Sequence, residues 1–320
     1  MRILLTGATG FVGSRLYAPL VARGHEVRCG SRSPDAARQR DPARAWTRLD
    51  LGDERSLDEA LEGCDAAYFL VHALSGAKAG YGARELEFAQ RFARVAARRN
   101  LSRVLYLGGL EPAPEALSAH LASRLAVGRA LREGKVPCLE LRASVIVGNG
   151  SASFRILRDL AARLPAMVLP AWLENRTEPV AIDDVISALV AGLSVPLPAS
   201  DWQDLPGSEA LSGREMLLRT AAILGIKPRT LRVPLLTPRL SARWLWVISG
   251  VDYRLAQELV DGLRCDLLAQ RRGFRERAGL PPPMSFDQAV RLALVERQRP
   301  SLRARAARGW EAVVRRLSPR

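Results

Sequence analysis

Residues 3–13 read ILLTGATGFVG and decide the fold. A short apolar run of strand type enters a turn with three regularly spaced glycines, and a helical pattern follows from Phe11 to Arg23. Gly24 is placed to end this helix as its C-terminal cap, and Pro19 predicts a kink inside it. A strand, a glycine turn and a helix in this order are typical of the first βαβ unit of a dinucleotide-binding fold.

Each glycine of the turn has its own steric reason. Gly7 permits the tight turn, Gly10 lets the backbone approach a pyrophosphate, and Gly13 lets the helix pack on the strand. The free N–H groups of the first helical turn then face the phosphates. The residues predicted to contact the dinucleotide here are Gly7, Thr9, Gly10, Phe11, Val12 and Gly13.

Strand and helix patterns alternate through the first 145 residues. Further strands are predicted at 26–30, 46–49, 66–71, 103–107 and 138–147, with helical spacings of apolar residues between most of them. This alternation predicts an α/β protein with a Rossmann-type doubly wound parallel sheet, covered on both faces and joined by right-handed crossovers. A ligand then lies at the carboxyl ends of the strands, near the switch in strand order.

The regular alternation ends near residue 150, where prolines begin to separate shorter elements. We predict a dinucleotide-binding domain at 1–150, to which later segments return, and a smaller, loop-rich substrate-side region at 151–296. Two helices of that region are predicted to start at an acidic pair, 183–184, and at a capping box, 212–215. The remaining residues, 297–320, form a separate tail.

Composition is that of a globular protein. The chain has 320 residues, of which 48% are hydrophobic and 25% charged, close to average values. The net charge is +15, and the tail at 297–320, with eight arginines against one acid, carries +7 of it. The body is therefore only moderately basic, and a specific nucleic-acid partner is not expected.

The tail has a helical pattern of its own. From Ser301 onward, Trp310, Val313, Val314 and Leu317 form an apolar stripe, and arginines occupy most of the other positions. Such a basic amphipathic helix either packs its stripe on the body of the protein or binds weakly to an anionic membrane surface. The sequence leaves both interpretations open.

Cysteine and histidine usage indicates neither disulfides nor a metal site. The four cysteines are far apart with no Cys-x-x-Cys pair, and the three histidines lack metal-site spacing. The cysteines are predicted to be structural thiols in a reducing compartment, and no bound metal is expected. No apolar run approaches the ~20 residues needed to cross a bilayer, and a strand beginning at Arg2 leaves no signal peptide. A cytoplasmic location, peripheral to a membrane if the tail binds lipid, is the expectation.

The motif TGATGFVG at 6–13 resembles the TGxxGxxG fingerprint of the extended and atypical short-chain dehydrogenases/reductases. The resemblance is closest to bacterial NAD(P)H-binding proteins of the NmrA-like and complex I 39-kDa-subunit-like branches, and it runs from Arg2 to about Leu294. It implies the Rossmann fold and NAD(P)H binding. The stretches that carry it further are LDLGD at 49–53, YLGGL at 106–110, LRASVIVGNGSASF at 141–154 and AIDDV at 181–185.

The end of the second predicted strand bears on the choice of cofactor. An NAD enzyme places an acid about 20 residues beyond the glycines to hold the ribose 2′-hydroxyl, whereas this chain has Gly30-Ser31-Arg32. The Arg32 guanidinium can bind a 2′-phosphate, with Ser31 as a neutral donor. We therefore predict that NADP(H) is preferred over NAD(H). The resemblance implies further contacts with the adenine and ribose at Asp50, Leu51, Val71 and His72.

The catalytic pattern departs from that of the family. Active short-chain reductases use Tyr-x-x-x-Lys, in which the lysine prepares the tyrosine to donate a proton, and no tyrosine of this chain pairs with a lysine at that spacing. The corresponding helix carries His120 and Arg124, and Gly108-Gly109 replaces the usual Ser or Thr. His120 is a candidate general acid and Arg124 a candidate ligand of the ribose or an oxyanion. In the alternative interpretation, His120 is a surface or capping residue. Other tyrosines that could donate the proton are Tyr68 and Tyr81.

The loop after the last predicted strand resembles the family loop that contacts nicotinamide and opens the substrate region. Candidate substrate-side residues are Asn149, Phe154, Met167, Trp172 and Arg176, each of which could equally be ordinary packing. An apolar pocket with one arginine suits a small hydrophobic carbonyl, enone or quinone-like substrate. Two functions follow: an NADP(H)-dependent atypical short-chain reductase, or a non-catalytic NADP(H)-bound redox sensor or assembly factor like the NmrA-like regulators.

Overall fold

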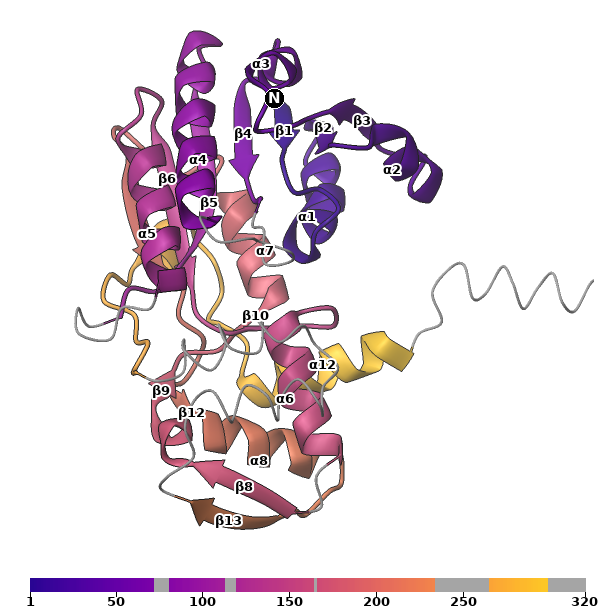
Figure 1. Cartoon of the computed structure of the whole chain (residues 1–320), viewed down its shortest axis with the longest axis vertical. Coiled ribbons are helices and arrows are strands. Elements are labelled where there is room, and N and C mark those ends of the chain that lie inside the picture. Colours follow the sequence, from indigo (N-terminus) through magenta and orange to yellow (C-terminus); the bar gives the residue numbers. More distant parts are fainter. Residues whose placement is uncertain (72–80, 113–118, 164–165, 234–264, 299–320) are drawn as a thin grey trace, which may run out of the picture.

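A seven-stranded parallel sheet forms the centre of the molecule (Figure 1). The computed structural model describes residues 1–71, 81–112, 119–163, 166–233 and 265–298. The strand order is β11-β6-β5-β4-β1-β2-β3, so the order reverses between β1 and β4. This confirms the predicted Rossmann-type doubly wound fold. The strands are β1 (Arg2–Leu5), β2 (Glu26–Ser31), β3 (Ala45–Arg48), β4 (Ala66–Phe69), β5 (Arg103–Gly109), β6 (Cys138–Ala143) and β11 (Asp201–Asp204).

The strand predicted at 138–147 is in fact two strands. β6 ends at Ala143, and β7 (Ile146–Val147) pairs with β10 (Val180–Ala181) outside the main sheet. The break coincides with a contact to a distant segment, since the Ser144 hydroxyl donates to the carbonyl of Glu178 at 2.6 Å. This contact draws the chain away from the sheet and into the second region.

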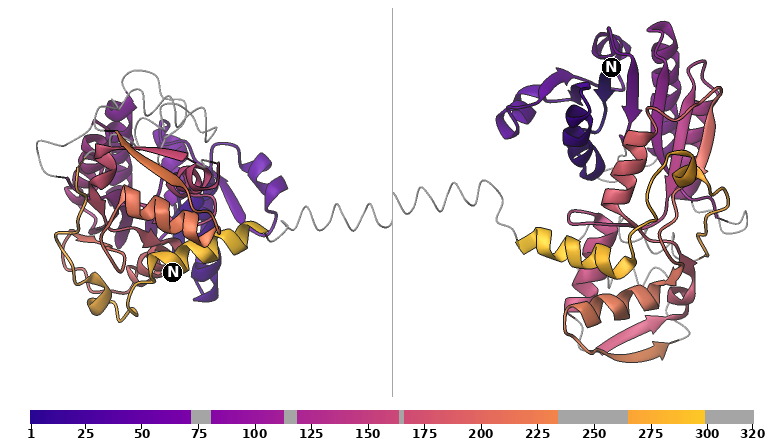
Figure 2. Two further views of the ribbon diagram at one scale, coloured as in Figure 1. Left: turned by 90° about the horizontal axis from the view of Figure 1, so that it is seen from below. Right: turned by 180° about the vertical axis from the view of Figure 1, so that it is seen from behind.

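Helices cover both faces of the sheet, as Figures 1 and 2 show. One apolar core joins the sheet to α1 (Phe11–Ala22) and α7 (Ile182–Ala191). A second core joins the other face to α3 (Glu54–Leu61), α4 (Tyr81–Arg98) and α5 (Ala119–Arg132). α2 (Pro34–Arg40) lies beside β3 at the sheet edge. Since α7 and β11 follow residue 150, later segments of the chain return to the first domain.

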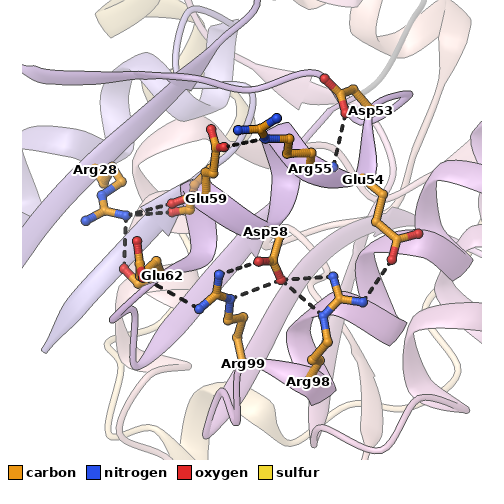
Figure 3. A network of polar contacts seen from close by, with 10 residues as sticks. Arg28, Asp53, Glu54, Arg55, Asp58, Glu59, Glu62, Arg98 and Arg99 are labelled. Carbon is orange, nitrogen blue, oxygen red and sulfur yellow. Dashed lines mark hydrogen bonds and ion pairs between the residues drawn. The ribbon is translucent and has the colours of Figure 1, made fainter.

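Polar contacts hold α3 against the end of α4 (Figure 3). Asp58 of α3 accepts hydrogen bonds from both Arg98 and Arg99, and Arg98 also donates to Glu54 at 2.9 Å. The hydrogen bonds from Arg99 and then Arg98 lower the pKa of the Asp58 carboxyl. The network is exposed to solvent, so it orients the two helices while contributing little to stability.

The second region packs at one end of the sheet (Figure 1). Its apolar core is separate from those of the sheet. α8 begins with the predicted capping box, in which the Ser212 hydroxyl accepts from the Glu215 N–H and the Glu215 carboxylate accepts from the Ser212 N–H. The elements of this region are α6 (Ala152–Arg163), β8 (Ala166–Pro170), η2 (Ala171–Glu174), β9 (Arg176–Thr177), β12 (Leu211–Ser212), α8 (Gly213–Ile223), β13 (Arg229–Val233) and α12 (Phe286–Gln298). The short helix α11 (Phe274–Arg277) instead buries Phe274 in the core that the sheet shares with α1 and α7.

A charged cluster is buried in β6. Glu140 is 0% and Arg142 2% exposed. Glu140 accepts from Arg132 of α5 at 2.8 Å and from Arg142 at 2.9 Å. Arg142 also donates to Glu111 at 2.8 Å and lies over the ring of Trp202. Each buried charge therefore has a partner of opposite sign, as the low-dielectric interior requires.

Two glycines leave room for the Glu140 carboxylate. A Cβ at Gly128 would lie 2.4 Å from its Oε1, and a Cβ at Gly108 would lie 2.7 Å from the same atom. Gly108 occupies the place where the resembling family usually carries Ser or Thr. The buried carboxylate gives a structural reason for that departure.

Two buried acidic groups predict that the fold weakens at alkaline pH. Burial raises the pKa of the Cys29 thiol to about 11 and that of the Tyr106 hydroxyl to about 12. Both groups ionise at lower pH in the unfolded chain, near 8.5 and 10. Their contribution is complete below those values and is lost as pH rises through the folded-state values. We expect the free energy of unfolding to fall above pH ~8.5, by at most about 1.4 kcal/mol per pH unit and group.

Urea titrations at several pH values between 8 and 11 test this expectation. Cys29→Ala should flatten the fall in the free energy of unfolding, because it removes one of the buried groups whose pKa is raised. Cys265→Ala is the matched control, since that thiol is only partly buried. Equal slopes for the two variants would contradict the assignment to Cys29.

The described residues contain neither a candidate membrane span nor a metal cluster. No helix among them is long and apolar enough to cross a bilayer. Nor does the described part of the chain bring together three or more His, Cys, Asp or Glu side chains that could hold a metal ion. The remaining thiols there, Cys64 and Cys138, are buried and unbridged.

Candidate functional site

A single cavity of about 1190 Å³ runs along the carboxyl ends of the strands. The segments after β1, β2, β4, β5 and β6 form one part of its wall, and α6, η2 and α8 form the other. The turns after β1 and β4, where the strand order reverses, both contribute. This is where doubly wound sheets bind their ligands.

The glycine turn after β1 is shaped by close backbone contacts. Gly7 has a φ of +64°, and a Cβ there would lie 2.5 Å from the carbonyl oxygen of Leu70. A Cβ at Gly13 would lie 2.3 Å from the carbonyl oxygen of Gly7. Neither position admits a larger residue without moving backbone. Gly10 has an ordinary φ of −78° and donates its N–H to Gly7 at 2.9 Å.

The start of α1 offers free donors to the cavity. Gly10 is the N-cap residue and supplies no side-chain acceptor. The first intrahelical bond is that of Ser14 to Gly10, so the N–H groups of Phe11, Val12 and Gly13 precede the hydrogen-bonded part of the helix. Together with the positive end of the helix dipole, these groups suit a pyrophosphate.

Arg44, which was not predicted from the sequence, stabilises this turn through hydrogen bonds to its backbone. Its guanidinium donates to the carbonyl of Ala8 at 3.3 Å and to that of Ser14 at 3.1 Å. The same group lies 4.5 Å from the ring centre of Tyr17. A side chain from the start of β3 thereby fixes both the glycine turn and the first turn of α1.

The end of β2 presents cationic and hydroxyl groups to the cavity. Arg32 is exposed and lines it, and the Ser31 hydroxyl accepts the N–H of Ser33 at 3.1 Å. Arg40, from the last turn of α2, lines the same stretch and was not anticipated from the sequence. Two guanidinium groups beside serine hydroxyls are suited to a phosphate ester. Asp50 also lines the cavity, and its carboxylate accepts the N–H of Gly52 at 2.9 Å.

The structure brings the predicted cofactor residues together in one wall. His72 lies outside the described residues. All the others line the cavity: Gly7, Thr9, Gly10, Phe11, Val12, Gly13, Ser31, Arg32, Asp50, Leu51 and Val71.

The catalytic candidates lie on α5. Arg124 lines the cavity and donates to the carbonyl of Leu107 at 2.8 Å. The Tyr106 hydroxyl donates to the carbonyl of Arg124 at 3.2 Å, which ties α5 to β5. His120 belongs to α5, and its side chain lies outside the described part of the structure. Position 120 is one turn before Arg124, and residues four apart share a helix face.

A carboxyl group that the sequence analysis did not single out also lies in this wall. Glu85 of α4 is 9% exposed and lines the cavity. The Ser123 hydroxyl of α5 donates to its Oε2 at 3.0 Å. The residue before it, Arg84, lines the cavity too. Only the packing of α4 on α5 brings this acid to the site, so no local motif could have indicated it.

One of the two tyrosines suggested as alternative proton donors, Tyr68, lies away from the cavity lining. Tyr68 is fully buried, and its hydroxyl donates to the carbonyl of Leu189 in α7 at 2.9 Å. Burial raises its pKa well above the usual value. Tyr68 therefore belongs to the core, a correction to the sequence-based suggestion. Tyr81 begins α4, and its side chain falls outside the described residues.

Of the predicted substrate-side residues, Trp172 lines the cavity. Three others are not among the described residues that line it. Phe154 is 2% exposed in the core of the second region. The carbonyl of Asn149 accepts from Arg15 at 2.6 Å. The exposed Arg176 side chain donates to the carbonyl of Ala210 at 3.0 Å. The Met167 side chain, in β8, lies outside the described residues.

Apolar side chains of α6, η2 and α8 take the place of those three residues in the wall. At sequence level their helical spacing is that of any buried helix face, so it gave no sign of a cavity. The side chains are Ile156, Leu157, Leu160, Leu173, Met216 and Leu217.

Comparison with known proteins agrees with this geometry. Residues 7–133 match the NAD(P)H-binding family. A ceramide reductase of Caulobacter vibrioides is 29% identical over 243 residues, which are 72% of this chain and 73% of that protein. A bifunctional dihydroflavonol 4-reductase/flavanone 4-reductase of Malus domestica is 37% identical over 78 residues, 22% of each chain.

Solved structures share the fold over nearly the whole chain. The triphenylmethane reductase of a Citrobacter species superposes with a TM-score of 0.73 at 18% identity, covering 92% of this chain and 99% of that one. MoeE5 in complex with UDP-glucose and NAD gives 0.66 at 18% identity, covering 93% and 99%. The chain thus contains an NAD(P)H-binding domain and has the fold of the extended and atypical short-chain dehydrogenases/reductases, as its TGxxGxxG motif indicated.

Proposed function

We propose that this chain is an NADP(H)-dependent reductase that transfers hydride to a hydrophobic carbonyl, enone or quinone-like substrate. The observation that carries the proposal is the continuity of one cavity from the glycine turn to an apolar wall. The ceramide, dihydroflavonol and triphenylmethane reductases named among the similar proteins are all reductases by name, which supports the same reaction class.

The residues of the first wall fit the cofactor. The turn at Gly7 and Gly13 leaves no space for a side chain, so the backbone itself forms the cradle for a pyrophosphate. Arg32 and Arg40 would hold a 2′-phosphate. When bound, NADPH supplies the hydride. The residues of the chain then have to orient the cofactor and provide the proton.

For the proton, two residues on the neighbouring helices α4 and α5 are candidates. His120 remains a candidate general acid, and Glu85 is a second one, since it lines the cavity and is held by Ser123. Arg124, anchored to the carbonyl of Leu107, can place positive charge beside a developing oxyanion. These roles replace the Tyr-x-x-x-Lys pair that the chain lacks.

NADPH oxidation against a panel of carbonyls, enones and quinones tests the proposal. We expect turnover of at least one hydrophobic member of the panel. We also expect kcat to fall at least ~10²-fold in the variant that lacks the general acid, either His120→Ala or Glu85→Gln. Turnover that survives both changes would exclude both residues but not the reductase. Tight NADPH binding with no turnover of any member would instead support a non-catalytic sensor or assembly factor of the NmrA-like kind, which the missing Tyr-x-x-x-Lys pair favours.

Arg32→Ala tests the cofactor preference. Hydrogen bonds to charged groups contribute about 1.5–3 kcal/mol, so we expect NADPH affinity to fall about 10- to 100-fold and NADH affinity to stay within about twofold. Fluorescence titration with both dinucleotides measures this. Arg55→Ala is the control, because that side chain is 87% exposed on α3 and outside the cavity. An equal loss for both dinucleotides would remove Arg32 from its 2′-phosphate role.

The tail carries a separate proposal about location. Residues 299–320 lie outside the described residues. Each Arg near an anionic surface contributes about 1 kcal/mol, so weak, salt-sensitive peripheral binding is expected. Co-sedimentation with phosphatidylserine vesicles at low and at 0.3 M salt, comparing the full chain with a version ending at Pro300, measures it. Equal sedimentation of the two proteins would contradict lipid binding by the tail.

A further inference from the structure

The cavity has room for more than a dinucleotide. Single small-molecule sites usually measure ~300–1,000 Å³, whereas this cavity measures about 1190 Å³. The glycine turn, the end of β2 and the ends of β4 to β6 account for one part of the wall. The part formed by α6, η2 and α8 contains none of the residues predicted to touch the cofactor. It is therefore the part left for a second ligand.

This distal part of the wall is mainly apolar, and its polar side-chain groups are the Ser153 hydroxyl and the Trp172 indole N–H. Among the described residues that α6, η2 and α8 contribute, none is charged. Its large side chains are Ile156, Leu157, Leu160, Trp172, Leu173, Met216 and Leu217. All the charged residues of the described lining, such as Arg32, Glu85 and Arg124, come from α2, α4, α5 and the ends of strands.

The chemistry of this wall favours an aliphatic chain over a sugar, because two polar side-chain groups cannot satisfy the several hydroxyls of a sugar ring. A sugar hydroxyl that loses water here would find few hydrogen-bonding partners, which costs free energy for each group. A planar ring gains most from aromatic side chains, and Trp172 is the one aromatic residue that these three elements contribute to the described lining. Leu, Ile and Met side chains, of which Met216 is unbranched and adaptable, match a flexible hydrocarbon instead.

We propose that the distal part of the cavity binds one unbranched aliphatic chain of the substrate, with the reactive carbonyl at the Arg124 end. The placement of the carbonyl rests on the proposed reductase function, whereas chain binding does not. The substrate class is then a long-chain aliphatic ketone, rather than a sugar nucleotide, flavonoid or quinone.

Calorimetric titration with 2-alkanones from 2-hexanone to 2-dodecanone tests the proposal without turnover. The titrations contain saturating NADP⁺, which cannot reduce a ketone. Burying one CH₂ contributes about 0.8 kcal/mol, so we expect affinity to rise about two- to fourfold per added CH₂ and at least ~50-fold across the series. Affinity independent of chain length, or tighter binding of menadione than of 2-dodecanone, would overturn the proposal.

Variants locate the chain within the cavity. Leu217→Trp places a larger side chain in the wall. We expect it to lower the affinity for 2-dodecanone about tenfold or more, while the affinity for 2-hexanone stays within about twofold. Leu217→Phe should give a smaller loss and serves if the tryptophan variant does not fold. Leu292→Trp is the control, because Leu292 is 46% exposed on α12. A loss in the control equal to that in Leu217→Trp would refute this location.

The two proposals fail in different ways. If the reductase proposal is wrong, NADPH oxidation is absent for every carbonyl while the affinity for 2-alkanones still rises with chain length. Without an aliphatic site, turnover of short or cyclic carbonyls persists while the alkanone series shows no trend. Repeating the titration without dinucleotide separates chain binding from cofactor binding.

Discussion

Glu140→Ala is expected to lower the free energy of unfolding by about 3–5 kcal/mol, the usual cost of leaving a buried charge unpaired. Arg142 is 2% exposed and Arg132 reaches Glu140 from α5. Removing the carboxylate breaks both ion pairs, so that the partly buried Arg132 loses this partner and the buried Arg142 keeps Glu111 alone. Urea denaturation followed by circular dichroism measures the change.

Glu62→Ala is the matched control for this prediction. Glu62 pairs with Arg99 at 3.8 Å, and its side chain is 71% exposed. Exposed pairs contribute about 0–1 kcal/mol, so the control should stay close to the unmodified protein. If both variants lost the same stability, the buried cluster would have no special role in the fold.

Gly10→Val is expected to abolish dinucleotide binding, with at least ~10²-fold loss for NADPH and NADH alike, while the chain still folds. The φ of Gly10 suits any residue, and the nearest atom to a Cβ there is the Gly7 oxygen at 3.1 Å. A side chain at this position therefore requires a shift of only a few tenths of an ångström in the turn. That side chain would nevertheless occupy the space through which a pyrophosphate approaches the start of α1.

Substitutions at two other glycines distinguish a loss of stability from a loss of binding. At Gly13 a Cβ would lie 2.3 Å from backbone, so Gly13→Val should unfold the turn rather than merely block the site. Gly24 has a φ of +78° but open space around it, so Gly24→Ala should cost about 1–2 kcal/mol of stability and leave binding intact. Native circular dichroism with binding retained within tenfold in Gly10→Val would contradict the proposed position of the pyrophosphate.

The fold was predictable because its signals are local. The turn at 6–13 and the strands before and after it follow from residue types a few positions apart, and so does the capping box at Ser212. The break after Ala143 was missed because it depends on a hydrogen bond from Ser144 to Glu178, 34 residues further along the chain. A run of strand-forming residues cannot indicate where its partner strand changes.

The site was predictable only where it consists of backbone and a motif. The glycine turn and Arg32 were found in this way. Arg44 and Glu85 were missed because each reaches the site through packing between distant elements. Phe154 was placed on the substrate side because an aromatic residue after a glycine loop fits a pocket and a core equally well. Burial at 2% decides for the core.

The most direct test of the central claim is a fluorescence titration of the unmodified chain with NADPH and with NADH. With Arg32 after β2 and Arg40 of α2 both lining the cavity, NADPH should bind at least ~10-fold more tightly than NADH, as expected for a 2′-phosphate held by charged hydrogen bonds. Failure to bind either dinucleotide, or tighter binding of NADH, would contradict the account.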